Sequence, residues 1–221
     1  MMMRLRARRI LLALAAGAVL WLAGHLPELA AAGPAGPTIS TGDAPSLKTG
    51  SPEVVLIEVS DFQCPYCGQS AREVLPRLEE KLVRPGKVEV IFLNLPLPTH
   101  PNAFQAAEAA MCAGRQKKFW EMHHLLFANQ QALAPAQLPG YAEKLGLDVA
   151  AFQKCLSDGL PAAEIRQEMR LAEDLVGAAT PVYLLGRRVP GSDTIQVVET
   201  VRGVRPYEEL EKKLNHLLNV K

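Results

Sequence analysis

The hydrophobic pattern of the first half of the chain predicts two buried strands separated by a helix. Residues 54–60 form a short run rich in valine and isoleucine, which is typical of a buried strand. Between residues 71 and 82 apolar side chains recur at helical spacing, and Pro76 should kink this helix because proline lacks the N–H for one internal hydrogen bond. Residues 87–95 predict a second strand, and a proline-rich turn follows it.

The second half of the chain predicts a helical block and then a return to strands. Helical periodicity covers almost all of residues 102–177, with glycine and proline at the breaks. Two further strands are expected over residues 180–186 and 194–201, and an amphipathic helix starts near Tyr207. This order predicts an α/β fold that carries an all-helical insertion, about residues 102–177, after its second strand.

The N-terminus carries the pattern of an export signal. Four arginines fall within residues 4–9, an apolar run covers residues 10–22, and small residues follow at 30–33. This arrangement describes a secretory signal peptide over residues 1–32. The apolar stretch 10–24 also fits an N-terminal membrane anchor, and that alternative stays open. Both alternatives place the bulk of the chain in the periplasm or another extracytoplasmic compartment.

The composition narrows the possible functions. The 221 residues are 48% hydrophobic and 21% charged, the proportions of a globular protein and not of a disordered one. The 24 basic and 23 acidic residues nearly cancel, so nucleic acid is not an expected partner. Residues 33–52 are rich in Gly, Pro, Ser and Thr and predict a flexible linker, which leaves residues 53–221 as the folded domain.

A Cys-x-x-Cys motif lies where the first strand gives way to a helix. Cys64 would occupy the helix N-terminus, with Pro65 in the first turn, and free N–H groups there stabilise a thiolate. Cys67, one turn further on and past Tyr66, should be more buried and able to resolve a mixed disulfide at Cys64. Glu58 lies near the end of the strand, where it is either a proton relay for Cys67 or an ordinary strand carboxylate.

The remaining cysteines and two histidines allow simpler interpretations. Cys112 and Cys155 lack a close Cys partner, so no structural zinc site is expected. In an exported protein they favour a structural disulfide, with a second redox relay or free thiols as alternatives. The Cys-x-x-Cys motif itself could bind a soft metal such as Cu(I) without catalysis. His100 is interpreted as a plain turn residue, and His123, on an apolar stripe, as a packed core residue.

The motif and its surroundings resemble a known family. Glu58 followed by Phe62-x-Cys64-Pro65-Tyr66-Cys67 is similar to the DsbA-like branch of the thioredoxin superfamily, whose members are exported thiol–disulfide oxidoreductases. The resemblance implies a thioredoxin fold with the helical domain inserted between the second strand and the cis-proline strand. It places Thr180-Pro181 at the cis-proline loop beside the cysteines, where the Thr180 backbone would pair with an extended substrate.

The resemblance also implies an activity and its partners. The Cys64–Cys67 couple would introduce or exchange disulfide bonds in exported polypeptides that carry thiols, and it needs no cofactor because the cysteines carry the electrons. A quinone-linked membrane protein of the DsbB or VKOR type would reoxidise it. A reductase or isomerase role stays open. The best-known DsbA motif has Pro-His between its cysteines, and the Pro-Tyr of this chain predicts a milder oxidant.

Overall fold

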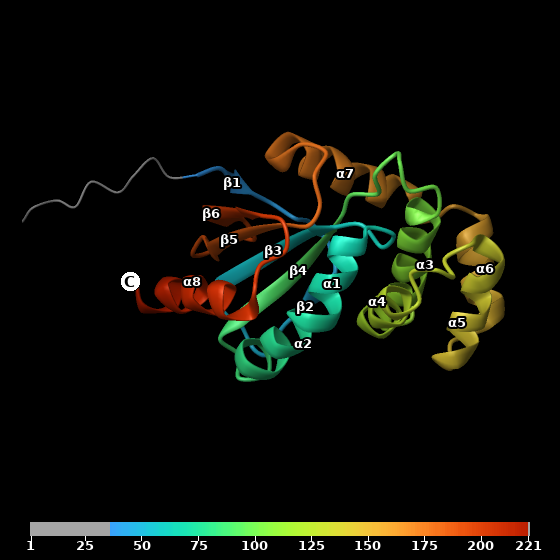
Figure 1. Ribbon diagram of the computed structural model, residues 1–221, viewed down its shortest axis with the longest axis horizontal. Helices are drawn as coiled ribbons and strands as arrows, with labels where there is room; N and C mark the ends of the chain where they lie inside the picture. The colour runs from blue at the N-terminus through green and yellow to red at the C-terminus, as the bar shows by residue number, and fades with distance from the viewer. Residues whose placement is uncertain (1–35, 221) are drawn as a thin grey trace, which may run out of the picture. The chain divides into compact units, whose positions relative to one another are not determined.

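The computed structural model describes residues 36–220 and has one mixed β-sheet flanked by helices (Figure 1). The strand order is β1-β6-β5-β3-β4-β2. The central strand β3 runs parallel to β4 and antiparallel to β5. The strands are β1 (Thr38–Ile39), β2 (Ser46–Leu47), β3 (Val54–Ser60), β4 (Val88–Asn94), β5 (Val182–Arg188) and β6 (Ile195–Arg202).

The sequence of β3 explains its central position. All seven of its residues are buried, as expected for a strand covered on both faces. Val54 and Leu56 belong to a core that includes residues of α2 (Leu75–Leu78) and α8 (Tyr207–Asn219). The alternate residues Val55, Ile57 and Val59 pack in a second core with α7 (Ala162–Val176). Figure 1 shows these helices on opposite faces of the sheet.

The helix after β3 is interrupted, as its proline predicts. Helix α1 (Pro65–Glu73) ends one residue before Val74, and α2 starts at Leu75 with Pro76 in its first turn. A π-helical turn, η1 (Glu79–Val83), continues it. Proline cannot donate the internal hydrogen bond and its ring clashes with the preceding turn, so the helix breaks at this position.

The helical insertion forms a core of its own against the start of α1. This core includes Phe62, Cys64 and Phe92 from the sheet side, so the insertion packs directly on the Cys-x-x-Cys turn. Cys112 on α3 and Cys155 on α6 form a disulfide bond. The elements of the insertion before α7 are α3 (Ala103–Arg115), α4 (Phe119–Ala128), η2 (Pro135–Gln137), α5 (Leu138–Lys144) and α6 (Val149–Ser157).

The prediction of a flexible linker over residues 33–52 is wrong for the part that the structure describes. Thr38–Ile39 pairs with β6 at one edge of the sheet, and Ser46–Leu47 pairs with β4 at the other. The Ser46 hydroxyl donates to buried Glu89 at 2.5 Å, and its carbonyl accepts from Trp120 Nε1 at 3.1 Å. Strands of two residues are too short to show periodicity, and their pairing partners come from distant parts of the chain.

The predicted signal peptide or anchor, residues 1–32, lies outside the described residues. Within residues 36–220, no helix combines the length and the apolar character needed to cross a bilayer.

Candidate active site

The two cysteines of the motif lie at the start of α1, as the sequence predicts. Cys64 is the N-cap residue, with extended backbone angles (φ −67°, ψ 123°), and Pro65 is the first helical residue. Both thiols are free. Cys67 is completely buried, whereas the intervening Tyr66 is 64% exposed. Cys64 is 3% exposed. A partner reaching this turn therefore meets the Tyr66 ring first, and of the two thiols only Cys64 keeps a small exposed surface.

The two thiols have opposite ionisation properties. A hydrogen bond from the Cys67 thiol lowers the pKa of Cys64 from 9.0 to about 5, aided by the Thr180 hydroxyl and the N–H groups of Cys67 and Tyr66. Desolvation opposes this shift without cancelling it. Burial raises the pKa of Cys67 well above its ordinary value, and the neighbouring Cys64 raises it further. Cys64 is therefore the nucleophile and leaving group, and Cys67 is the protonated partner.

The loop before β5 completes the site on the side of Cys64. The Thr180–Pro181 peptide bond is cis, in agreement with the resemblance. The Cys64 Sγ donates to the Thr180 carbonyl oxygen at 3.8 Å. The Thr180 Oγ1 is buried and has no partner at hydrogen-bonding distance among residues 36–220, so its hydroxyl is free to turn toward a thiolate.

Glu58 is buried in the centre of the sheet. It is 2% exposed, and burial raises its pKa from 4.5 to about 7, with the hydroxyls of Ser60 and Ser70 offsetting part of the effect. Its Oε1 has no hydrogen-bond partner in the described part of the chain. Its neighbour across the sheet, Tyr183, donates to the Ser70 hydroxyl at 2.7 Å. Because α1 carries both Ser70 and Cys67, these polar groups lie in the buried layer behind the thiols.

Asp61 is a site residue that the sequence analysis did not identify. It lies in the turn before Cys64, and its Oδ1 accepts the N–H groups of Gln63 at 2.7 Å and of Cys64 at 3.1 Å. An aspartate that bonds backbone groups two and three residues ahead is an Asx turn. The order Asp-Phe-Gln-Cys was therefore a usable sequence signal for this turn.

The interpretation of His100 as a plain turn residue is wrong. Its Nδ1 lies 2.8 Å from Asp61 Oδ2, in a loop that follows β4 and comes back to the cysteine turn. Gln130, after α4, donates from Nε2 to the carbonyls of Phe62 at 2.9 Å and Cys64 at 2.8 Å. These contacts join residues 39 and 66 positions apart, and no local sequence pattern indicates them.

A groove runs from the cysteine turn across the surface. It has a volume of about 660 Å³ and passes between α1–α2, the cis-proline loop and the start of α8. Arg77 and Glu208 form an ion pair across it at 2.6 Å. The residues that line it are Tyr66, Gln69, Glu73, Val74, Arg77, Thr180, Pro181 and residues 203–208.

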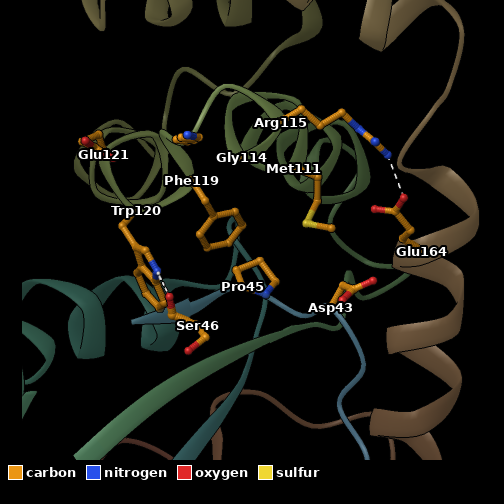
Figure 2. Close-up of a pocket in the computed structure, with 11 residues that line it drawn as sticks. Asp43, Pro45, Ser46, Met111, Gly114, Arg115, Phe119, Trp120, Glu121 and Glu164 are labelled. Atoms are coloured by element: carbon orange, nitrogen blue, oxygen red, sulfur yellow. Dashed lines mark hydrogen bonds and ion pairs between the residues drawn. The ribbon is translucent and has the colours of Figure 1, made fainter. Parts of the chain in front are cut away.

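A second cavity is separate from the cysteines. Figure 2 shows it between residues 43–46 and the helices α3 and α4, with a volume of about 370 Å³. The ion pair between Arg115 and Glu164, at 2.7 Å, lies at its rim. None of the residues that line it is a predicted site residue. Across residues 36–220, no three carboxylate, imidazole or thiol side chains are grouped as a metal site.

The family of the chain follows from a match to most of the folded domain. Residues 47–200 match the model of a family described as Thioredoxin, which is more than half of the 221-residue chain. The chain belongs to this thioredoxin family.

The solved structures that it resembles include DsbA proteins. Wolbachia pipientis alpha-DsbA1 superposes with a TM-score of 0.69 at 21% identity, covering 80% of this chain and 91% of the other. BdbD from Bacillus subtilis gives a TM-score of 0.67 at 19% identity, covering 80% and 94%. Pseudomonas aeruginosa DsbA2 gives 0.61 at 25% identity, covering 78% and 92%. The predicted thioredoxin fold with a DsbA-like helical insertion is confirmed.

Relatives that match in sequence are named as Na(+)/H(+) antiporters. A Na(+)/H(+) antiporter NhaA 1 of Salinispora arenicola is 42% identical over 153 residues, which cover 66% of this chain and 22% of the antiporter. A Na(+)/H(+) antiporter NhaA of Herminiimonas arsenicoxydans is 33% identical over 164 residues, or 71% and 25%. The matched segment thus spans about a quarter or less of these relatives.

Proposed function

We propose that this chain is a thiol–disulfide oxidoreductase that oxidises cysteine pairs in exported polypeptides. The observation that carries the proposal is the inequality of the two thiols, with a low pKa at Cys64 and a raised pKa at buried Cys67. Thiol–disulfide exchange needs one sulfur that leaves easily and one that is shielded from incoming partners. The DsbA-like fold supports the same class of chemistry.

The reaction starts from the oxidised Cys64–Cys67 bond. A substrate thiolate attacks Cys64 Sγ, the bond to Cys67 breaks, and Cys67 takes up a proton because its pKa is raised. A second substrate thiolate then attacks the substrate sulfur of the mixed disulfide, and Cys64 leaves as a thiolate. The substrate loses two electrons as its disulfide forms, and the Cys64–Cys67 pair gains them. A low thiol pKa favours this release, because low-pKa thiols leave faster.

Glu58 has the properties of the proton donor for this exchange. Its pKa of about 7 leaves a substantial protonated fraction near neutral pH, and no described residue satisfies its Oε1. A proton passed through the buried polar layer of Ser60 and Ser70 would neutralise Cys67 as it leaves Cys64. Proton transfer from a carboxyl group tuned close to the working pH is efficient in both directions.

The groove beside Thr180 and Pro181 is the proposed substrate site. An extended polypeptide pairing with the Thr180 backbone would bring its cysteine to Cys64, which already contacts the Thr180 carbonyl. The groove carries charges of both signs, so its selectivity would rest on backbone pairing and not on one charged side chain. We further propose that the chain acts outside the cytoplasm and is reoxidised by a quinone-linked membrane protein of the DsbB or VKOR type.

The Cys67→Ala variant of the full chain tests this proposal. In this variant the Cys64 thiolate attacks a disulfide already present in an exported polypeptide, and the second sulfur of that disulfide leaves as a thiolate. Without Cys67 to attack Cys64 in return, the mixed disulfide should persist and be detected as an adduct that a reductant releases. The Cys64→Ala/Cys67→Ala double variant is the matched control and should trap nothing. A Cys67→Ala protein that folds and alkylates at Cys64 but forms no adducts would contradict the proposal. Loss of bound Cu(I) without adducts would instead favour the metal-binding alternative.

A further inference from the structure

The Asp61 carboxylate joins two loops at the active site. Its side chain is fully buried, and both oxygens accept hydrogen bonds. Oδ1 holds the N–H groups of Gln63 and Cys64, and Oδ2 accepts the Leu97 N–H at 2.7 Å. Because the carboxylate accepts all of these bonds, His100 Nδ1, at 2.8 Å from Oδ2, is the donor of the fourth.

His100 brings the loop after β4 to the cysteine turn. Its side chain is 21% exposed, so it lies between solvent and the buried carboxylate. Gln63 Oε1 accepts the Asn102 N–H at 2.7 Å and makes a second bond between the same two loops. In the described part of the chain, His100 is the only basic side chain in contact with Asp61. A buried carboxylate that lost this donor would turn toward solvent to recover it.

The orientation of Asp61 matters for Cys64. The Cys64 N–H is fixed both by Asp61 Oδ1 and by the Asp61 carbonyl, each at 3.1 Å. These bonds hold Cys64 in its N-cap position. From there the N–H groups of Tyr66 and Cys67 help to stabilise its thiolate. If the Asp61 side chain rotated, the Cys64 N–H would lose one of its two hydrogen bonds, and the sulfur could move away from the N–H groups of the helix.

We propose that His100 is a positioning residue that acts on Cys64 through Asp61, by donating the hydrogen bond that keeps the carboxylate oriented toward the cysteine turn. The inference rests on the proposed function, in which Cys64 is the nucleophile. What matters is a donor at the Nδ1 position. An asparagine amide nitrogen can occupy nearly the same place, which makes His100→Asn the conservative variant and His100→Ala the disruptive one.

The test is the pH profile of Cys64 alkylation by iodoacetamide in the reduced full chain. Cys67 does not compete, because it has no exposed surface and its raised pKa keeps it protonated. His100→Ala should raise the apparent pKa of Cys64 by about one unit and slow alkylation about tenfold on the acidic side of the profile, the size expected for one lost hydrogen bond to a charged group. His100→Asn should restore the rate to within about twofold of the original chain.

Two outcomes would overturn the proposal. One is an unchanged profile in His100→Ala, and the other is a His100→Asn variant as impaired as His100→Ala. The control His124→Ala removes a half-buried histidine that is bonded to Glu79 and should leave the profile unchanged. Thermal unfolding of each variant shows whether it is folded. Asp61→Asn removes the carboxylate itself and should raise the apparent pKa of Cys64 in the same direction as His100→Ala. Alkylation needs no polypeptide substrate, so a failure of adduct trapping and a failure of this proposal are separate results.

Discussion

Replacing Glu58 by glutamine should change how the stability of the protein depends on pH. Burial raises the pKa of Glu58 from 4.5 to about 7 in the folded state. Each pKa unit corresponds to about 1.4 kcal/mol, so ionising this carboxyl costs the folded state about 3 kcal/mol relative to the unfolded chain. The side chain is 2% exposed, so solvent screening does not reduce this value appreciably.

The direction in which stability changes with pH follows from the raised pKa of Glu58. Below 4.5 Glu58 is protonated in both states, and its contribution to stability is fully present. As the pH rises from 4.5 through about 7, the unfolded chain releases its proton first, and stability is lost. The glutamine side chain of Glu58→Gln does not ionise, so this variant does not lose stability in this way. Its stability relative to the original chain should therefore increase by about 3 kcal/mol between about pH 4 and about pH 8.

Urea unfolding of the reduced protein at several pH values measures this difference. The control is Glu143→Gln, which makes the same substitution at an exposed carboxyl on α5, away from the buried site. Glu168, the other carboxyl whose pKa burial raises to about 7, is present in both proteins and cancels from the comparison. If the Glu58→Gln difference did not increase over this pH range beyond that of the control, the carboxyl would not be the neutral buried acid that the proposed proton transfer requires.

Two other perturbations give independent expectations. His123 is completely buried, and neither ring nitrogen has a hydrogen-bond partner among residues 36–220, so His123→Leu should stabilise the protein by about 1–2 kcal/mol. Burial holds the pKa of His123 well below 6.5, so in urea unfolding this gain should grow as the pH falls below 6.5; no gain at any pH would refute the reasoning. Replacing Cys112 and Cys155 by alanine opens a loop whose ends are 43 positions apart and should cost roughly 4 kcal/mol by chemical denaturation. The same variant should leave alkylation of Cys64 unchanged, and a slower reaction would mean that the second cysteine pair acts on the first.

The parts of the site that are contiguous in sequence were predictable. The strand, the Cys-x-x-Cys turn and the helix after it are local features, and the order of Cys64 and Cys67 along α1 determines which thiol is shielded. The break at Pro76 has an equally local cause. The edge strands within residues 36–52 were missed because they depend on pairing with β4 and β6 and carry no pattern of their own.

The residues that contact the cysteine turn but lie far from it in the sequence could not be predicted. His100 and Gln130 have ordinary polar side chains in loops, and their role depends on how the helical insertion and the loop after β4 fold back on the cysteine turn. The unequal pKa values also depend on tertiary contacts. A helix N-terminus indicates a low pKa for Cys64, but the hydrogen bond from Cys67 is the largest single contribution to the shift.

The reduction potential of the Cys64–Cys67 couple, measured by equilibration with glutathione, tests the central claim most directly. Thioredoxin combines a cysteine pKa near 7 with a potential of about −270 mV, and DsbA lies at about −120 mV. A Cys64 pKa of about 5 stabilises the reduced form further and predicts a potential of roughly −220 mV near pH 7. A value at or below about −270 mV would contradict the account, because the chain would then donate electrons to protein disulfides instead of accepting electrons from protein thiols.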